Sequence, residues 1–403
     1  MQGKKFLRSI RLKNLLSYGE EGVSLDLEPL NVLIGPNASG KSNLIEVLGL
    51  LAALPRDLFA PIRDGGGIDS WIWKGSGDPS GAGLEAVLES AETRPRLHYE
   101  IAFAPEGVRV RVLNESLGYE PAPDSTPSED FIYANNGKVA MAKTRLVTKT
   151  GRKMSRLVPE YFGVEISSDQ SVFSQLKGLD VYPELTEVGE LFGNIKLFRQ
   201  WNLGRLAPPR FPQKADLPGD FLLEDASNLG LVLNDLQHRA STRQVLIKKL
   251  QAFYESIQEV TTKVQGGTIQ VFLHEEGLNA PIPATRISDG TLRYLCLLAI
   301  LLHPEPPPLI CMEEPELGLH PDIIPTVAEL LIEASQRTQL IVTTHSEMLV
   351  SALSGVPESV VICERDDRGT SLRRLAPEKL TEWLEHYRLG DLWAKGEIGG
   401  NRW

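Results

Sequence analysis

A loop of eight residues, GPNASGKS at positions 35–42, constrains this chain more than any other feature. The apolar run LNVLIG leads into it, and SNLIEVLGLLAAL, which has helical apolar spacing, follows it up to Pro55. The order is therefore strand, glycine-rich turn and helix. Glycines let backbone N–H groups approach phosphate oxygens, and the helix N-terminus adds the positive end of its dipole. A full GxxxxGK[ST] pattern in this context predicts a nucleoside triphosphate site, because a chance glycine-rich turn would need both flanks to match by accident.

The residues of this loop have distinct expected roles. Lys41 is expected to reach the β and γ phosphates, and the Ser42 hydroxyl is expected to ligate Mg²⁺. The other residues expected to contact the nucleotide are Gly35, Pro36, Asn37, Ala38, Ser39, Gly40 and Asn43. The predicted cofactors are ATP and Mg²⁺.

A second apolar run, PLICM, ends in the acidic segment EEPE at positions 313–316. Carboxylates at the C-terminal end of a buried parallel strand emerge where ligands bind in open α/β sheets. There we expect Glu313 to hold the Mg²⁺ and its hydration shell, and Glu314 to orient or deprotonate the attacking water. A solvated acidic turn is the alternative for this segment, and Glu316 fits a surface charge equally well.

Two further polar segments fit the same site. The residues Ser288, Asp289, Gly290 and Thr291 precede a clear helix about twenty residues before PLICM. Ser288 suits an N-cap and Gly290 permits a close backbone approach. Downstream, the apolar run QLIVTT ends at His345, whose imidazole could touch a γ-phosphate. A lone histidine is more often structural, so its predicted role depends on the other three segments.

The chain alternates between helical and strand patterns from Ile287 onward, so we predict an α/β fold in which the parallel strands lie near residue 30 and beyond residue 300. Three strand candidates between about Leu84 and Val112 suggest an antiparallel sheet, and the segment from Leu222 to about Val264 has helical patterning. The predicted parts are an N-terminal lobe (1–115), an insertion with a basic loop and a helical subdomain (116–265), a C-terminal lobe (266–375), and a helix with a Trp/Gly tail (376–403).

Composition limits the partners. Lys plus Arg number 42 against 53 for Asp plus Glu, so the formal charge is −11 and any DNA contact must use a local basic patch. Two segments qualify: Lys138–Arg156, and Arg199–Lys214, where Trp201 and Phe211 lie among cations. A solvated loop is the alternative for both. No apolar run reaches the length of a membrane span, and we expect a cytoplasmic protein without a membrane partner.

The order GPNASGKS, ISDGT, LICMEEPE, LGLH, TTHS resembles the ABC-type ATPases, and IRLKNLLSYG…LNVLIGPNASGKSNLIEVL resembles their RecF/SMC branch, as in RecF-like and OLD-like AAA-family ATPases. The likeness covers roughly residues 4–54 and 284–364. It implies an ABC-type P-loop head with a mixed or parallel core sheet, an antiparallel β subdomain and a helical insertion. By position it makes Gly35–Ser42 the Walker A motif, Ser288–Thr291 the signature motif, Glu313 and Glu314 the Walker B pair, Leu317–His320 the D-loop and His345 the H-loop.

The resemblance also implies a head-to-tail homodimer, or a higher homo-oligomer, in which Ser288 and Gly290 of one copy close on the γ-phosphate held by the other. Three departures stand out. Asp289 replaces a glycine of the familiar LSGGQ, Glu313 replaces an aspartate, and no Q-loop glutamine can be assigned. The stretch GGGIDSWIWKGS from Gly65 occupies the approximate place of the Q-loop.

We therefore expect an ATPase that dimerises on ATP, senses or clamps double-stranded DNA, and controls a separately encoded effector, a nuclease or toxin, in anti-phage defence or DNA repair. A fused TOPRIM nuclease is not expected, because only about 40 residues follow SVVICERDD. The C-terminal LGDLWAKGEIGGNRW, too short for a core, suits a docking tail. The alternative is a slow ATP-gated scaffold that stores and releases a partner protein; a transporter ATPase is a third reading.

Overall fold

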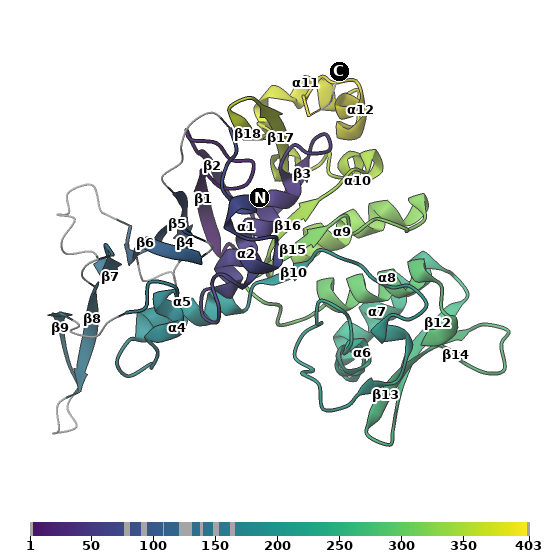
Figure 1. Ribbon diagram of the computed structural model, residues 1–403. Helices are drawn as coiled ribbons and strands as arrows, with labels where there is room; N and C mark the ends of the chain where they lie inside the picture. The colour runs from purple at the N-terminus through teal and green to yellow at the C-terminus, as the bar shows by residue number, and fades with distance from the viewer. Residues whose placement is uncertain are drawn as a thin grey trace.

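A six-stranded sheet forms the centre of the molecule (Figure 1), in the order β10-β15-β16-β3-β17-β18. The computed structural model describes residues 3–75, 81–89, 95–107, 109–120, 131–137, 140–147, 153–161 and 166–400. The strands are β10 (Lys196–Phe198), β15 (Leu309–Glu313), β16 (Gln339–Thr343), β3 (Leu30–Ile34), β17 (Val360–Asp366) and β18 (Gly369–Arg374). Neighbours are parallel from β10 to β17, and β18 returns antiparallel. The predicted mixed α/β sheet is confirmed, and β10 is an additional strand contributed by the insertion.

Both faces of this sheet are covered. Leu309 and Cys311 of β15 pack with helix α1 (Lys41–Ala53), whereas Ile310 and Met312 pack with α8 (Asp289–Leu301) and α9 (Ile324–Ala334). Alternate residues of one strand therefore enter two different cores. This explains why the strands read as uninterrupted apolar runs rather than as alternating patterns.

An eight-stranded antiparallel sheet lies on the α1 side, in the order β2-β1-β4-β5-β6-β7-β8-β9. Its strands are β1 (Leu7–Lys13), β2 (Val23–Asp26), β4 (Ala82–Leu88), β5 (Leu97–Glu106), β6 (Arg109–Tyr119), β7 (Phe131–Asn135), β8 (Ala140–Val147) and β9 (Lys153–Tyr161). The three predicted strands correspond to β4, β5 and β6. Within the basic segment Lys138–Arg156, the structure describes side chains only at positions 140–142. Its predicted DNA contact therefore stays a prediction.

A separate lobe contains α6 (Leu229–His238), α7 (Ala240–Phe253) and a small sheet. The strands of that sheet are β11 (Gln213–Lys214), β12 (Ile257–Gln265), β13 (Thr268–Glu275) and β14 (Ile282–Pro283). The predicted helix is therefore wrong from Ile257 to Val264. The sequence IQEVTTKV is rich in β-branched residues, and Gly266 and Gly267, with φ of +58° and +76°, make the turn that pairs β12 with β13.

The remaining α-helices have between 4 and 11 residues, and the last one completes the core. They are α2 (Ala60–Asp64), α3 (Ile68–Trp71), α4 (Val172–Gln175), α5 (Pro183–Gly193), α10 (Glu347–Ala352), α11 (Thr381–Leu384) and α12 (Leu389–Ala394). In α12, Leu389 and Leu392 are fully buried with the residues of α10. The Gly400 N–H donates to Glu364 Oε1 at 2.8 Å. Up to residue 400 the predicted docking tail is thus docked on its own chain.

A buried carboxylate in the antiparallel sheet gives a testable pH dependence. Glu115 is 1% exposed and accepts hydrogen bonds from the Tyr99 hydroxyl at 2.9 Å, the Ser171 hydroxyl at 2.5 Å and the Val172 N–H at 2.8 Å. Burial raises the pKa of Glu115 to about 6, against the lowering effect of these hydrogen bonds. The native state therefore binds a proton that the unfolded state releases between an ordinary carboxyl pKa and about 6.

We expect the free energy of unfolding to fall as pH rises through that window, by up to about 2 kcal/mol from this group. Glu115→Gln should remove this part of the pH dependence. Denaturant unfolding of both proteins at several pH values between about 4 and 7 checks it. Parallel profiles for the wild type and the variant would contradict the assignment.

Candidate active site

The loop at 35–42 joins the end of β3 to the start of α1. Two of its glycines lie where the backbone φ and the close neighbours exclude a side chain. Gly35 has a φ of +150° and Gly40 a φ of +100°. A Cβ at Gly35 would lie 2.2 Å from the Cys363 carbonyl oxygen, and one at Gly40 would lie 2.3 Å from Thr370 Oγ1. The Thr370 hydroxyl donates to the Ser39 carbonyl at 2.9 Å. The loop is therefore held closely by β17 and β18, and a side chain at Gly35 or Gly40 would not fit.

The two reactive side chains of the loop point into the same region. Lys41 is 6% exposed, and its Nζ donates to the carbonyls of Gly35 at 2.8 Å and Pro36 at 2.9 Å. Burial lowers the pKa of Lys41, while Glu314 counteracts the effect. The Ser42 hydroxyl donates to Glu313 Oε2 at 3.0 Å. A hydroxyl and a carboxylate in contact are oxygen donors of the kind that Mg²⁺ prefers.

Glu314 and His345 face each other across the ends of two strands. The Glu314 N–H donates to the Thr343 carbonyl at 3.0 Å, and Glu314 has a φ of +44°, which is unusual for a residue with a Cβ. His345 Nε2 lies 3.9 Å from Glu314 Oε1. Burial and the charge of Lys41 lower the pKa of His345, against the raising effect of Glu314. Backbone strain at Glu314 is the kind found at functional sites.

Glu316 is a correction to the sequence analysis. It is 8% exposed, not a surface charge. Its Oε1 accepts hydrogen bonds from the Thr344 hydroxyl and, at 3.3 Å, from the His345 N–H. Burial raises the pKa of Glu316. The residue ties the turn after β15 to the segment after β16, and so helps to place His345.

The segment Ser288–Thr291 begins α8, and Ser288 is the predicted N-cap: its hydroxyl oxygen accepts from the Thr291 N–H at 3.0 Å. A Cβ at Gly290 would lie 3.0 Å from the Gly318 carbonyl oxygen, in the turn at 317–320. Asp289 is paired with Arg210. Among the described residues, no hydrogen bond joins this segment to the loop at 35–42.

Arg210 is almost completely buried, and its guanidinium donates hydrogen bonds to residues of two loops. It donates to the carbonyls of Leu203 at 2.9 Å and Ile287 at 2.6 Å. It also pairs with the carboxylate of Asp289. Arg210 therefore fixes the residues that precede α8 and neutralises the acidic residue that stands where a glycine is more familiar. It does not present its charge to solvent.

Residues that follow β10 surround Glu313, and the sequence analysis missed them as site residues. Arg199 Nε donates to Glu313 Oε1 at 3.1 Å, and Trp201 Nε1 donates to the Glu313 carbonyl at 2.9 Å. The Arg293 guanidinium lies 5.2 Å from the Trp201 ring centroid and donates to the Glu314 carbonyl at 3.3 Å. The prediction that Arg199–Lys214 offers its cations to DNA is wrong for Arg210, which is 4% exposed. Arg199, whose side chain is 42% exposed, and Trp201 contact Glu313, and their predicted DNA contact stays a prediction.

The assignment of the stretch from Gly65 to the approximate place of the Q-loop stays a prediction. Within this stretch, Ser70, Ile72, Trp73 and Lys74 line a cavity of about 630 Å³ beside the phosphate loop. The residues next to Glu313 come from the end of β10, where Gln200 follows Arg199. In the local sequence, only the short run KLF before these polar residues indicates the strand β10. A three-residue strand is too short to be recognised by pattern.

The structure brings most of the predicted site together. Lys41, Ser42, Glu313, Glu314 and His345 lie at one edge of the central sheet, where β3, β15 and β16 end. Asn43 lies beside the loop, but its side chain donates to the Ser17 hydroxyl at 2.7 Å. The glycine cradle and the oxygen donors fit a Mg²⁺-bound nucleoside triphosphate. Among the described residues, neither Ser288–Thr291 nor His320, whose side chain is 73% exposed, is hydrogen-bonded to these five side chains.

Solved structures show the same fold. An SMC head domain bound to the C-terminal winged-helix domain of ScpA superposes with a TM-score of 0.57 at 14% identity, over 93% of this chain and 99% of that one. A second SMC head domain has an extended coiled coil and is bound to the C-terminal domain of ScpA from Pyrococcus furiosus. It superposes with a TM-score of 0.57 at 12% identity, over 94% of this chain and 98% of that one. At such identities the likeness defines the fold alone.

Sequence relatives cover shorter parts. The Old nuclease of Escherichia phage P2 is 31% identical over 129 residues, 29% of this chain and 22% of its own length. The DNA replication and repair protein RecF of Exiguobacterium sp. (strain ATCC BAA-1283 / AT1b) is 35% identical over 123 residues, 26% of this chain and 32% of its own. The chain thus spans about a third or less of either relative.

The fold is that of SMC head domains, and about a quarter of the sequence is similar to parts of Old nuclease and RecF. Residues 30–137 and 201–351, more than half of the chain, match the family described as "AAA domain, putative AbiEii toxin, Type IV TA system", and the chain belongs to that family. Among the described residues, no helix is both long enough and apolar enough to span a bilayer.

Proposed function

We propose that the chain hydrolyses ATP with Mg²⁺ at the edge of the central sheet. Lys41 binds the β and γ phosphates, and Ser42 and Glu313 hold the Mg²⁺, which neutralises phosphate charge. Glu314 orients the attacking water and accepts its proton, and His345 contacts the γ-phosphate. The observation that carries the proposal is the convergence of a phosphate loop with Glu313, 3.0 Å from Ser42, and with Glu314, 3.9 Å from His345.

Other contacts of the nucleotide follow from this position. The phosphate-loop residues that line the 630 Å³ cavity are Pro36, Asn37, Ala38 and Ser39. Trp73 and Arg365 form a further wall, and the Arg365 guanidinium lies 5.8 Å from the Trp73 ring centroid. We place the nucleoside there. Gln200, in the segment that contacts Glu313, takes the Q-loop position.

The site becomes complete only with a second copy. The start of α8 is turned toward Arg210 and Gly318, so Ser288–Thr291 acts on the nucleotide held by another copy in a head-to-tail homodimer. Arg210 is then a positioning residue: it sets the loop before α8 and cancels the charge that Asp289 would otherwise bring near phosphates.

This assignment predicts a charge-specific rescue. Arg210→Met leaves Asp289 unpaired, and like-charge repulsion from the γ-phosphate should weaken ATP-dependent self-association by at least about tenfold. The double variant, Arg210→Met with Asp289→Asn, should regain a substantial part of the lost self-association, because the repulsive carboxylate is gone. Sedimentation with ATP measures association, and nucleotide titration of each variant serves as the control. If the double variant associates no more strongly with ATP than Arg210→Met does, the role of Arg210 is purely structural.

At the level of the cell, we propose an ATPase that senses DNA and controls a separately encoded effector, a nuclease or toxin, in anti-phage defence or DNA repair. The similarity to Old nuclease and RecF and the toxin–antitoxin wording of the family description support this. A slow ATP-gated scaffold is the second candidate. It is favoured by the intramolecular contacts of Arg199, Trp201 and Arg210, which occupy part of one predicted DNA-contact segment.

Steady-state ATP hydrolysis with and without double-stranded DNA tests the proposal, with mass measured in parallel. DNA-stimulated turnover together with ATP-dependent dimers supports the DNA sensor. Negligible turnover, indifferent to DNA, in a fixed oligomer supports the scaffold. Absence of nucleotide binding by the wild-type chain would overturn both.

A further inference from the structure

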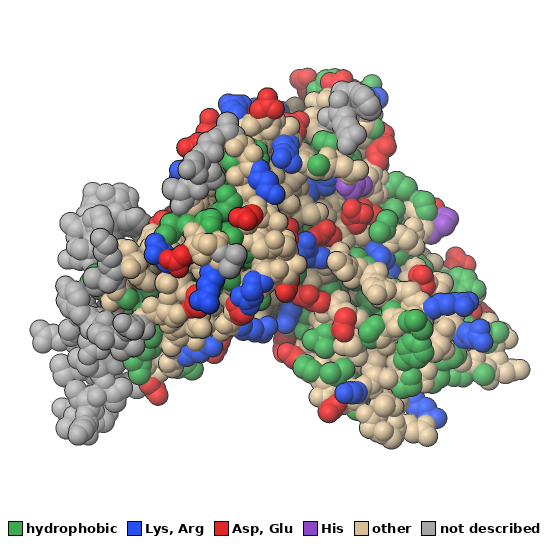
Figure 2. Space-filling view, viewed as in Figure 1, with side chains coloured by type: hydrophobic (Ala, Val, Ile, Leu, Met, Phe, Trp, Pro, Cys, Tyr) green, Lys and Arg blue, Asp and Glu red, His purple; other side chains and the backbone are tan. Residues whose placement is uncertain are grey.

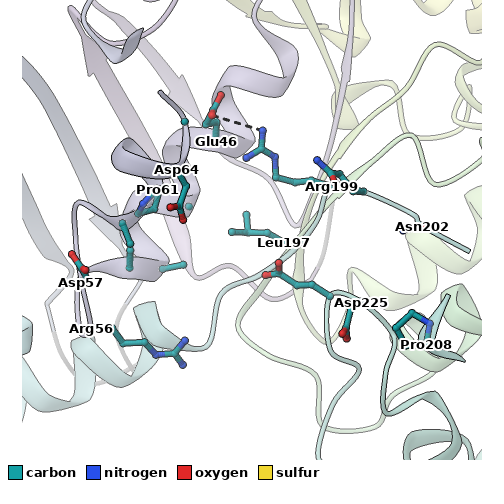
Figure 3. A pocket seen from close by; sticks show the side chains of 17 residues that line it. Glu46, Arg56, Asp57, Pro61, Asp64, Leu197, Arg199, Asn202, Pro208 and Asp225 are labelled. Atoms are coloured by element: carbon teal, nitrogen blue, oxygen red, sulfur yellow. Dashed lines mark ion pairs between the residues drawn. The ribbon is translucent and has the colours of Figure 1, made fainter. Parts of the chain in front are cut away.

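A groove of about 1040 Å³ runs beside the proposed ATPase site (Figure 3). Helices α1 and α2 form one wall, and the segments after β10 and before α6 form the other. The apolar and small residues that line it are Gly49, Ala52, Ala53, Ala60, Pro61, Gly65, Leu197 and Pro208. Figure 2 shows the molecule hollowed between its main body and the lobe of α6 and α7. The volume lies at the upper end for small-molecule pockets and accommodates several side chains of a protein segment.

Negative charge surrounds this apolar floor. Five lining residues are acidic, namely Glu46, Asp57, Asp64, Glu224 and Asp225, against the two cations Arg56 and Arg199. Arg199 is already paired, 3.1 Å from Glu313 and 3.8 Å from Glu46, and Asp57 is paired with Arg63. Among the described residues, no ion pair holds Asp64, Glu224 or Asp225, although the charges of Lys196 and Arg199 act on Glu224. Such a groove repels DNA phosphates and attracts lysine and arginine.

One side chain joins the groove to the proposed metal site. Glu46 lies on α1 one helical turn after Ser42 and pairs with Arg199 (Figure 3). Arg199 also contacts Glu313. A cation placed against Glu46 would compete with Arg199 for that carboxylate. The pairing of Arg199 with Glu313, and with it the charge around Glu313, would then change.

We propose that this groove binds a basic segment of a partner protein. Lysine and arginine head groups pair with the carboxylates, and their aliphatic stems cover the apolar floor. The inference deepens the proposed function and rests on it for the partner's identity as a controlled effector. Binding itself requires no nucleotide. Through Arg199, docking and Mg²⁺-nucleotide binding influence each other reciprocally.

The test uses the full chain without nucleotide and a fluorescently labelled short peptide rich in arginine and alanine, followed by anisotropy. The groove variant carries Asp64→Asn, Glu224→Gln and Asp225→Asn. Its matched control carries Glu378→Gln, Glu382→Gln and Glu385→Gln, which remove the same charge at exposed positions near α11. We expect about tenfold weaker binding to the groove variant and less than about a twofold change in the control.

Equal weakening in both variants would show non-specific attraction to an acidic protein and overturn the proposal, as would absence of peptide binding by the wild type. Thermal unfolding checks that the variants fold. In a second measurement, the peptide should change the Mg²⁺ dependence of nucleotide binding in the wild type but not in Arg199→Met. Persistence of that change in Arg199→Met would overturn the coupling. Failure of ATP hydrolysis alone would overturn the proposed function and leave peptide binding standing.

Discussion

Replacing Glu314 with glutamine is expected to lower steady-state ATP hydrolysis by at least about a hundredfold, because a positioned proton acceptor contributes roughly 10²- to 10⁴-fold. The amide keeps the size and the hydrogen-bonding oxygen of the side chain but cannot accept a proton from water. Nucleotide binding should persist, since Lys41 and the phosphate loop are unchanged. ATP should then hold the proposed dimer closed, so the variant should accumulate as a dimer with ATP.

Rate and mass are measured on the same samples. Glu333→Gln is a suitable control, because Glu333 lies on α9 and contacts Lys249 at 3.2 Å, away from the site. It should retain wild-type turnover. Undiminished hydrolysis by Glu314→Gln would remove the proton-acceptor role, and a slow variant that stays monomeric with ATP would separate hydrolysis from dimerisation.

Replacing Lys41 with alanine is expected to weaken nucleotide binding by about a hundredfold. Hydrogen bonds to charged groups contribute roughly 1.5–3 kcal/mol each, and the ammonium is the only side-chain cation of the loop at 35–42. The variant also loses the two bonds from Nζ to the Gly35 and Pro36 carbonyls, so the loop itself becomes less ordered. Hydrolysis and ATP-dependent dimers should both disappear.

Titration with a fluorescent ATP analogue measures the affinity. Lys395→Ala is the control, because Lys395 lies over the Tyr387 ring at 3.8 Å in the C-terminal segment. It should bind nucleotide like the wild type. Tight binding by a folded Lys41→Ala protein would exclude the loop as the principal phosphate contact.

The phosphate loop, the acidic strand end and the histidine could be predicted because each depends on neighbours in the chain. Strand, turn and helix follow one another at Gly35–Ser42, and Glu313 directly ends an apolar run. Parallel strands that end at one sheet edge then bring such residues together. The strand β12 was misjudged because its partner β13 and the Gly266–Gly267 turn, not its own period, decide its conformation.

The amino-acid sequence by itself thus determined the fold class, the nucleotide loop and the carboxylates beside it. The tertiary structure alone decided that Arg199 and Trp201 surround Glu313, that Arg210 neutralises Asp289, and that Glu316 is buried. The paired residues of the first two contacts lie between 79 and 114 positions apart in the chain. No periodicity relates residues so distant, because the pairing arises only when β10 is added to the sheet edge beside β15 and the intervening lobe folds back.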